Sequence, residues 1–179
     1  SNGFSLVRHI LASAKLGYTD RSDDLGGVVG EVLLEPTRLY TAPLLRLISD
    51  PHVGTSVHAL SHVTGGGIAA NLARVLPVGA WVELDRGSWS PAPVFRVLAD
   101  LGGMRLEEAE GTWNLGIGMI AVVAAHAADA VISKLGIDGL PAWVAGTVST
   151  SIRTLEGFEQ GAKGVTGGAV RLVGDYPSA

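Results

Sequence analysis

The run His62-Val63-Thr64-Gly65-Gly66-Gly67 is the part of the sequence whose residue types could do chemistry. Three successive glycines let a backbone approach a ligand without interference from side chains, and amides at the start of a following helix attract an anion. The pattern therefore favours phosphate binding, although a tight turn between a strand and a helix would use glycines in the same way. It is neither a Walker loop, because the Lys-Ser/Thr pair is missing, nor a GxGxxG fingerprint.

His62 stands at the beginning of this run, where an imidazole could donate a hydrogen bond to a phosphate or exchange a proton near neutral pH. A purely structural histidine in a strand is the alternative. His58 comes four residues earlier, and on a strand both side chains would point to the same face. The spacing suggests no third ligand for a metal ion, so the sequence predicts no metal site.

Asn114, Thr37 and Arg38 are further candidates for contacts with a substrate. Asn114 opens Asn-Leu-Gly-Ile-Gly-Met, whose two glycines suggest close backbone approach at the entrance of a strand. An asparagine in a turn is the alternative. Thr37 and Arg38 offer a hydroxyl and a guanidinium on a loop, which suits phosphate or carboxylate, and a solvated arginine is the alternative.

Secondary-structure elements must position these residues, and hydrophobic periodicity predicts where they lie. Helices are predicted over residues 4–15, 25–33, 44–48, 68–76, 91–101 and 126–135, and strands over residues 55–63, 81–84, 117–124, 142–148 and 169–173. The glycine run therefore falls between a strand and a helix. The alternation of types predicts an α+β fold, α/β-like, with a mixed β-sheet flanked by helices.

Composition excludes several classes of protein. The 179 residues are enough for one domain with a substantial core, and 47% of them are hydrophobic. A net charge of -4 with scattered basic residues argues against a nucleic-acid partner. Glu107, Glu108 and Glu110 form an acidic run that is interpreted as the solvated face of a helix. The absence of cysteine excludes disulfides and fits a reducing compartment, so the cytoplasm is expected.

The most apolar run, residues 115–128, does not predict a membrane span. It lasts only about 14 residues, where a span needs about 20, and it contains two glycines and His126. No signal-peptide pattern opens the chain. Its abrupt start on a predicted helix leads us to expect a truncation.

Four motifs follow one another along the chain. They are Ser-Asn-Gly-Phe-Ser-Leu-Val-Arg at residues 1–8, Glu-Pro-Thr-Arg-Leu-Tyr at 35–40, His-Ala-Leu-Ser-His-Val-Thr-Gly-Gly-Gly at 58–67 and Trp-Asn-Leu-Gly-Ile-Gly-Met at 113–119. Their order and content resemble consecutive landmarks in the carboxyl-terminal domain of the phosphoribosylformylglycinamidine cyclo-ligases, also called aminoimidazole ribonucleotide synthetases. The resemblance runs from residue 1 to about residue 148, and residues 168–177 match more weakly.

This resemblance implies a domain organisation. Residues 1–179 would form a single carboxyl-terminal synthetase-type domain, and the family's amino-terminal domain, with ATP binding and dimerisation, would be absent from this chain. The full-length enzyme would be a cytoplasmic homodimer. The isolated domain is expected to be inactive, because a cleft built by two domains cannot preorganise its reacting groups with one wall missing.

The resemblance also implies an activity. The full-length ligase would use ATP and Mg²⁺ to phosphorylate the formyl-derived oxygen of formylglycinamidine ribonucleotide, and ring closure would then give aminoimidazole ribonucleotide, ADP and phosphate. His62 would be the catalytic residue of this domain, beside the reacting group. The positions implied for substrate binding are Asn2, Thr37, Arg38, Thr64, Gly65, Gly66, Gly67 and Asn114.

Two other classes of function stay open at this stage. One is another ATP-dependent enzyme of the same superfamily, such as a selenophosphate synthetase, a thiamine-monophosphate kinase or a hydrogenase-maturation protein. Their glycine segment usually begins with an aspartate, whereas this chain reads His62-Val63-Thr64. The other class is a non-catalytic phosphate-binding or assembly module.

Overall fold

The computed structural model describes residues 2–162 and 164–178, so Ser1 of the first motif lies outside the described residues. The helices are α1 (Phe4–Ser13), α2 (Val29–Leu33), α3 (Thr41–Ile48), α4 (Gly67–Ala73), α5 (Pro93–Leu101), α6 (Leu106–Ala109) and α7 (Ala128–Ile137), with single 3-10 turns at Gly54–Ser56, Arg86–Ser88 and Ala125–Ala127. The strands are β1 (Arg21–Ser22), β2 (Gly27–Val28), β3 (Val57–His62), β4 (Trp81–Asp85), β5 (Met119–Val123), β6 (Glu159–Ala162) and β7 (Val165–Val173). The predicted α+β class is confirmed.

The strands form three small sheets. β1 pairs with β2, β3 pairs antiparallel with β5, and the third sheet has the order β4-β7-β6. That third sheet is mixed, because β4 is parallel to β7 while β6 is antiparallel to it. In the β3–β5 pair, His62 lies opposite Met119. The end of β3, which leads into the glycine run, therefore lies beside the start of β5, which follows the Asn114 motif.

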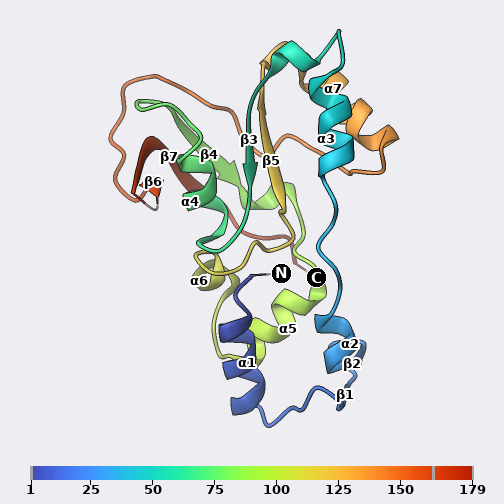
Figure 1. Ribbon diagram of the computed structural model, residues 1–179. Helices are drawn as coiled ribbons and strands as arrows, with labels where there is room; N and C mark the ends of the chain where they lie inside the picture. Colours follow the sequence, from blue (N-terminus) through green and yellow to red (C-terminus); the bar gives the residue numbers. More distant parts are fainter. Residues whose placement is uncertain (1, 163, 179) are drawn as a thin grey trace.

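The helices pack around these sheets in two regions. In Figure 1 the β3–β5 pair stands in the upper half, with α3 and α7 on one side and α4 with the β4–β7–β6 sheet on the other, while α1, α2 and α5 lie below. Three hydrophobic clusters fill the interior. We call them the α4 cluster (with Ile68, Leu72, Val82, Leu84 and Val170), the α1 cluster (with Val7, Ile10, Leu11, Leu98 and Trp113) and the α3 cluster (with Leu44, Leu47, Val131 and Leu135).

Helix α1 illustrates how the sequence pattern directs this packing. Its buried residues are Val7, Ile10 and Leu11, at positions i, i+3 and i+4, so they share one face of the helix. The predicted helix over residues 4–15 is present and ends two residues early. A long α1 with one apolar face holds the amino-terminal segment, including Asn2, against the rest of the domain.

The predicted strand over residues 142–148 is wrong. Within this segment Gly146 forms an isolated bridge with Leu84 of β4, and a second isolated bridge, Ser149 with Trp81, lies just beyond the segment. Gly146 comes so close to β4 that a Cβ atom on it would lie 2.4 Å from the Glu83 carbonyl oxygen. Residues 142–145 line a cavity instead of extending a ladder, so no continuous strand forms.

The predicted helix over residues 25–33 is only partly correct. Gly27 and Val28 pair with Ser22 and Arg21 in a two-residue hairpin, and α2 begins only at Val29. The apolar run over residues 115–128 folds as a turn, β5 and a 3-10 turn. Among the described residues, no helix has both the length and the apolar character that crossing a membrane requires.

Candidate functional site

The glycine run connects β3 directly to α4. Gly66 and Gly67 have φ angles of 101° and 76°, a conformation that glycine adopts without steric cost. A Cβ atom on Gly67 would lie 1.6 Å from the carbonyl oxygen of Glu110, so packing alone requires glycine there. A Cβ atom on Gly65 would lie 3.9 Å from Asn2 Oδ1, which is an ordinary contact distance. The turn interpretation therefore explains Gly67, and Gly65 is the glycine beside the Asn2 side chain.

Asn71 of α4 holds the loop from beneath, although the sequence did not single it out. Its Nδ2 donates to the carbonyl oxygens of Thr64 (3.1 Å) and Gly67 (2.6 Å). Its Oδ1 accepts from Thr64 Oγ1 (3.2 Å) and Arg74 Nη2 (2.6 Å). All four hydrogen-bonding positions of a side chain that is 0% exposed are thus used. In the sequence, this role of Asn71 is indicated only by its position as a polar residue on the apolar face of the helix predicted over residues 68–76.

Residues 110–116 bring the separate motifs together. The Glu110 carbonyl contacts Gly67, as described above. Trp113 and Thr112 pack against Gly3, where a Cβ atom would lie 2.5 Å from Trp113 Cδ1 and 2.9 Å from Thr112 Cγ2. Because Asn2 precedes Gly3 and Asn114 follows Trp113, this one segment unites the first motif, the glycine run and the fourth motif.

Asn114 is an asparagine in a tight turn. Its carbonyl oxygen accepts from the amide of Ile117 (2.8 Å), and its Oδ1 accepts from the amide of Gly116 (3.3 Å). Leu115 adopts a φ of 47°, which is rare for a residue other than glycine. The buried Trp89 indole donates to the Leu115 carbonyl (3.2 Å) and fixes this turn from the opposite side.

Tyr40 contacts His62 and lines the same cavity as Arg38. His62 is exposed at the end of β3, and its ring lies edge-on to Tyr40 with a centroid separation of 6.3 Å. Tyr40 also covers Gly118, where a Cβ atom would lie 2.0 Å from the phenolic oxygen. Arg38 lines the same cavity as Tyr40 and Gly118. Thr37 is exposed on this connection, and no hydrogen bond among the described residues ties it to the glycine run.

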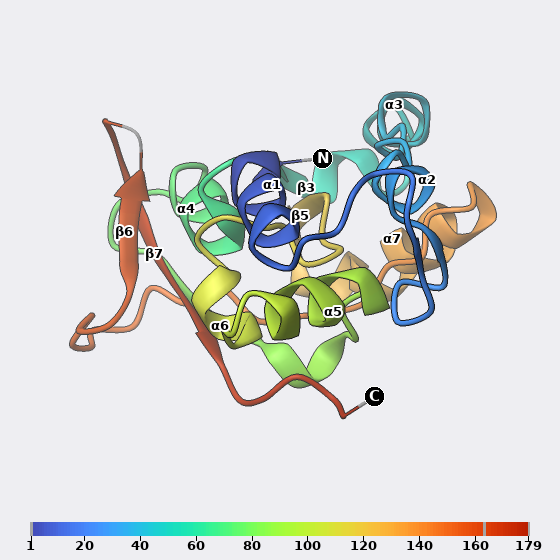
Figure 2. The ribbon, with the colours of Figure 1, turned by 90° about the horizontal axis from the view of Figure 1, so that it is seen from below.

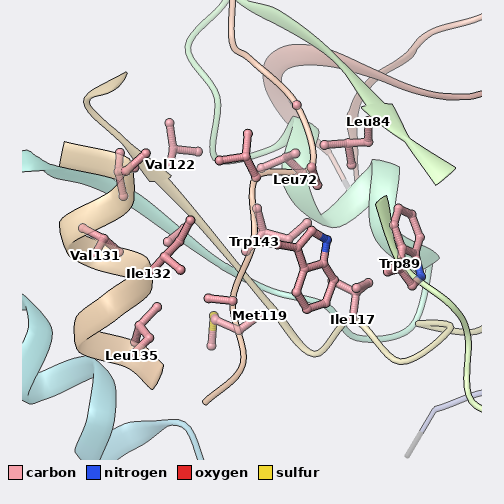
Figure 3. Close-up of a pocket in the computed structure, with 18 of the residues that line it drawn as sticks. Leu72, Leu84, Trp89, Ile117, Met119, Val122, Val131, Ile132, Leu135 and Trp143 are labelled. Atoms are coloured by element: carbon pink, nitrogen blue, oxygen red, sulfur yellow. The ribbon is translucent and has the colours of Figure 1, made fainter. Parts of the chain in front are cut away.

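A cavity of about 590 Å³ opens beside these residues. Most of its walls are apolar and come from β5, α7 and residues 140–148, and Arg38 and Tyr40 belong to its lining. Figure 3 shows the Trp143 indole in the middle of this space, between the α7 side chains and Trp89. The volume lies within the usual range of small-molecule sites. Its apolar walls could hold an uncharged part of a ligand but offer no acid or base.

Glu110 corrects the interpretation of the acidic run as a solvated face. Its carboxylate accepts two hydrogen bonds from Arg86, at 2.6 Å and 2.9 Å, and a third from the Tyr176 hydroxyl at 2.7 Å. The Glu110 side chain is only 14% exposed. Burial together with the bond to Glu110 raises the pKa of Tyr176, and the bond to Glu110 raises the pKa of Arg86. Arg86 therefore stays charged and Tyr176 keeps its hydroxyl proton across the ordinary pH range.

The described residues contain no group of three or more His, Cys, Asp or Glu side chains that could hold a metal ion. His58 and His62 are both exposed, and the strand register between Val57 and Ala59 is irregular. The Mg²⁺ implied by the resemblance therefore finds no group of this kind among the described residues.

A family model described as "AIR synthase related protein, C-terminal domain" matches residues 1–154. The chain belongs to this family. This AIR synthase related domain is 44% identical over 177 residues to a protein of Streptomyces fradiae, whose name assigns it provisionally to the phosphoribosylformylglycinamidine cyclo-ligases. The alignment covers 98% of this chain and 90% of that protein. The resemblance read from the four motifs is confirmed.

Longer relatives of the domain are named phosphoribosylformylglycinamidine cyclo-ligases without a provisional qualifier. It is 47% identical over 150 residues to the phosphoribosylformylglycinamidine cyclo-ligase of Sorangium cellulosum, and 40% identical over 155 residues to that of Symbiobacterium thermophilum. These alignments cover 83% and 84% of this chain. They cover 42% and 43% of the two relatives, so the domain spans less than half the length of each.

Proposed function

We propose that this domain forms the substrate-phosphate side of a cyclo-ligase cleft. One observation supports the proposal: Asn2 lies beside Gly65, and residues 110–113 contact both Gly67 and Gly3, so that three motifs distant in the sequence meet. Residues Thr64–Gly67 would bind the phosphate of the ribonucleotide through backbone amides at the start of the run, because glycines let that phosphate approach closely, whereas the Gly67 amide already donates to the Thr64 carbonyl at 3.2 Å. Asn2 and Asn114 would contact the remainder of the substrate.

His62 and Arg38 have separate roles in this proposal. The exposed imidazole of His62 would donate or accept a proton beside the reacting group, with Tyr40 holding its ring. Arg38 would pair with an anionic group of the substrate through its guanidinium, and Thr37 would add a hydroxyl. Both lie on the exposed connection before α3, which is free to meet a ligand.

We further infer that the complete enzyme converts formylglycinamidine ribonucleotide and ATP to aminoimidazole ribonucleotide, ADP and phosphate. The names of the longer relatives support this reaction. ATP and Mg²⁺ would be bound mainly by an amino-terminal domain that residues 1–179 do not include, which would also make the main homodimer contact. The cytoplasm is the proposed compartment, and the domain alone is expected to lack activity.

Calorimetric titration with aminoimidazole ribonucleotide, and separately with ATP and Mg²⁺, tests this division of labour. We expect the domain to bind the ribonucleotide and not ATP, and His62→Ala to weaken ribonucleotide binding. The matched control is His9→Ala, which removes another exposed histidine, on α1, and should leave the affinity unchanged. Ribonucleotide binding that is equally strong in both variants would exclude His62 from the site.

A further inference from the structure

The segment that follows β7 is bound to the body of the domain. Residues 174–177 lie beyond the family match, which ends at residue 154. Arg86 Nη1 donates to the Gly174 carbonyl at 3.0 Å, and Arg96 donates to the Pro177 carbonyl. Figure 2 shows this segment leaving β7 and passing α6 on its way to the C-terminus. Two arginines from different elements therefore fasten the segment to the body of the domain.

Tyr176 is the residue of this segment that packs into the interior of the domain. Its ring packs against both the α4 cluster and the α1 cluster. The ring stands edge-on to Trp89 with a centroid separation of 5.3 Å, and the Arg86 guanidinium lies 6.0 Å from its centroid. The ring is thus fixed independently of its hydroxyl, which leaves the hydroxyl aimed at Glu110.

Glu110 connects Tyr176 to the glycine run. Its side chain is held from two directions, by both arms of Arg86 and by the Tyr176 hydroxyl. Its main-chain carbonyl occupies the space where Gly67 has no side chain. We therefore expect a shift of the Glu110 backbone to displace Gly67, because the two backbones are in close contact and protein interiors are tightly packed.

We propose that Tyr176 is a positioning residue for the glycine run and that it acts through Glu110. The inference rests on the proposed function, in which the same loop binds the ribonucleotide phosphate. With Tyr176 in place, the Glu110 carbonyl holds the Gly66–Gly67 turn, and the amides of the run stay in one arrangement before the ligand arrives. Preorganisation of this kind strengthens binding by removing the cost of ordering the site.

Tyr176→Phe tests the proposal, because it keeps the packed ring and removes only the bond to Glu110. We expect the amide resonances of Gly66, Gly67 and Glu110 to shift in the unliganded domain. We also expect aminoimidazole ribonucleotide to bind about three- to tenfold more weakly, since a hydrogen bond to a charged carboxylate is lost and only part of its effect reaches the loop. Tyr18→Phe, at an exposed tyrosine, is the control and should change neither quantity.

A second variant separates positioning from simple stabilisation. Glu110→Gln keeps an acceptor for Tyr176 but weakens the pair with Arg86, and its effects on the Gly67 resonance should not add to those of Tyr176→Phe if both act along one path. A lower melting temperature with unchanged Gly66 and Gly67 resonances would show a merely structural role and overturn the proposal. So would additive effects of the two substitutions. The resonances are read without ligand, so a failure of wild-type ribonucleotide binding would refute only the proposed function.

Discussion

The carbonyl oxygen of Glu110 lies 1.6 Å from the point where a Cβ atom on Gly67 would stand. Glu110 lies far from Gly67 in the sequence and outside the motif that contains it, yet neither backbone could keep its position if Gly67 carried a side chain. A glycine triplet that looks like one phosphate-binding motif thus contains positions with different tasks. Gly67 serves packing, while Gly65 faces Asn2 across an ordinary contact distance of 3.9 Å.

Paired substitutions at these glycines should separate folding from binding. Gly67→Ala must displace Glu110 and adopt a φ of 76°, so we expect a loss of about 2–5 kcal/mol in the free energy of unfolding. Gly65→Ala should change stability by less than about 1 kcal/mol but weaken ribonucleotide binding, because its methyl group lies on the approach to the amides. Urea unfolding and calorimetry measure the two effects. Equal losses of stability would contradict this assignment.

The buried amide of Asn71 should matter more for stability than its sequence context suggests. Asn71→Leu has a similar size but removes four side-chain hydrogen bonds, including those to the carbonyl oxygens of Thr64 and Gly67. We expect a loss of about 2–4 kcal/mol. Asn114→Ala is the comparison, since its side chain makes one 3.3 Å bond, and should lose about 0.5–1.5 kcal/mol. Chemical denaturation of both variants checks the ranking, and a larger loss at Asn114 would reverse it.

Hydrophobic periodicity correctly predicted those helices and strands in which apolar residues recur regularly on one face. The helix beginning at Phe4 and the strand containing His62 appear where periodicity places them. The failure at residues 142–148 has a different origin, because alternation says nothing about whether a partner strand is available. Here β4 offers only two isolated bridges, and the chain lines a cavity instead.

Motifs identified the candidate site residues, whereas contacts between residues distant in the sequence could not be predicted. Asn2 and the glycine run were identified from their motifs, and the structure places Asn2 Oδ1 beside Gly65, while Asn114 lies in a turn with Gly116. Glu110 was interpreted as solvated because its partner Arg86 is 24 residues away and no local spacing links them. Asn71 was overlooked because its hydrogen bonds to Thr64 and Gly67 form only when the glycine run is folded, and the sequence does not show that geometry.

Tyr40 should control the environment of His62. A methyl group from Gly118→Ala would lie 2.0 Å from the Tyr40 hydroxyl, so the ring must move away from Gly118 and change its position relative to His62. We expect the His62 ring protons to shift in the NMR spectrum, because an edge-on aromatic neighbour is lost, with about 1–3 kcal/mol of destabilisation. Gly116→Ala also has an unfavourable φ, of 91°, but its Cβ atom would meet nothing within 4 Å. It should leave the His62 signals in place, and a shift there as large as that from Gly118→Ala would contradict this account.

The pair of Asp50 and Lys134 should make the packing of α3 on α7 sensitive to acid. Lys134 Nζ lies 2.6 Å from Asp50 Oδ2, and Asp50 Oδ1 accepts from the amides of His52 (2.8 Å) and Val53 (3.2 Å). The hydrogen bond from Lys134, followed by that from the His52 amide, lowers the pKa of Asp50 from 3.8 to about 2. Because the folded-state pKa is the lower one, this carboxylate stabilises the fold above pH 3.8, and the contribution disappears as the pH falls to about 2.

Asp50→Asn tests that dependence, since asparagine can still accept from the two amides but cannot pair with Lys134. We expect the wild-type protein to be more stable than the variant at about pH 5, and the difference in urea midpoint to shrink as the pH falls from 3.8 to about 2. Asp24→Asn, at an exposed position outside the helices, is the control and should follow the wild-type curve. A wild-type advantage that stays constant down to pH 2 would mean that the stability difference does not come from the ionised carboxylate, and that the link between α3 and α7 depends on packing alone.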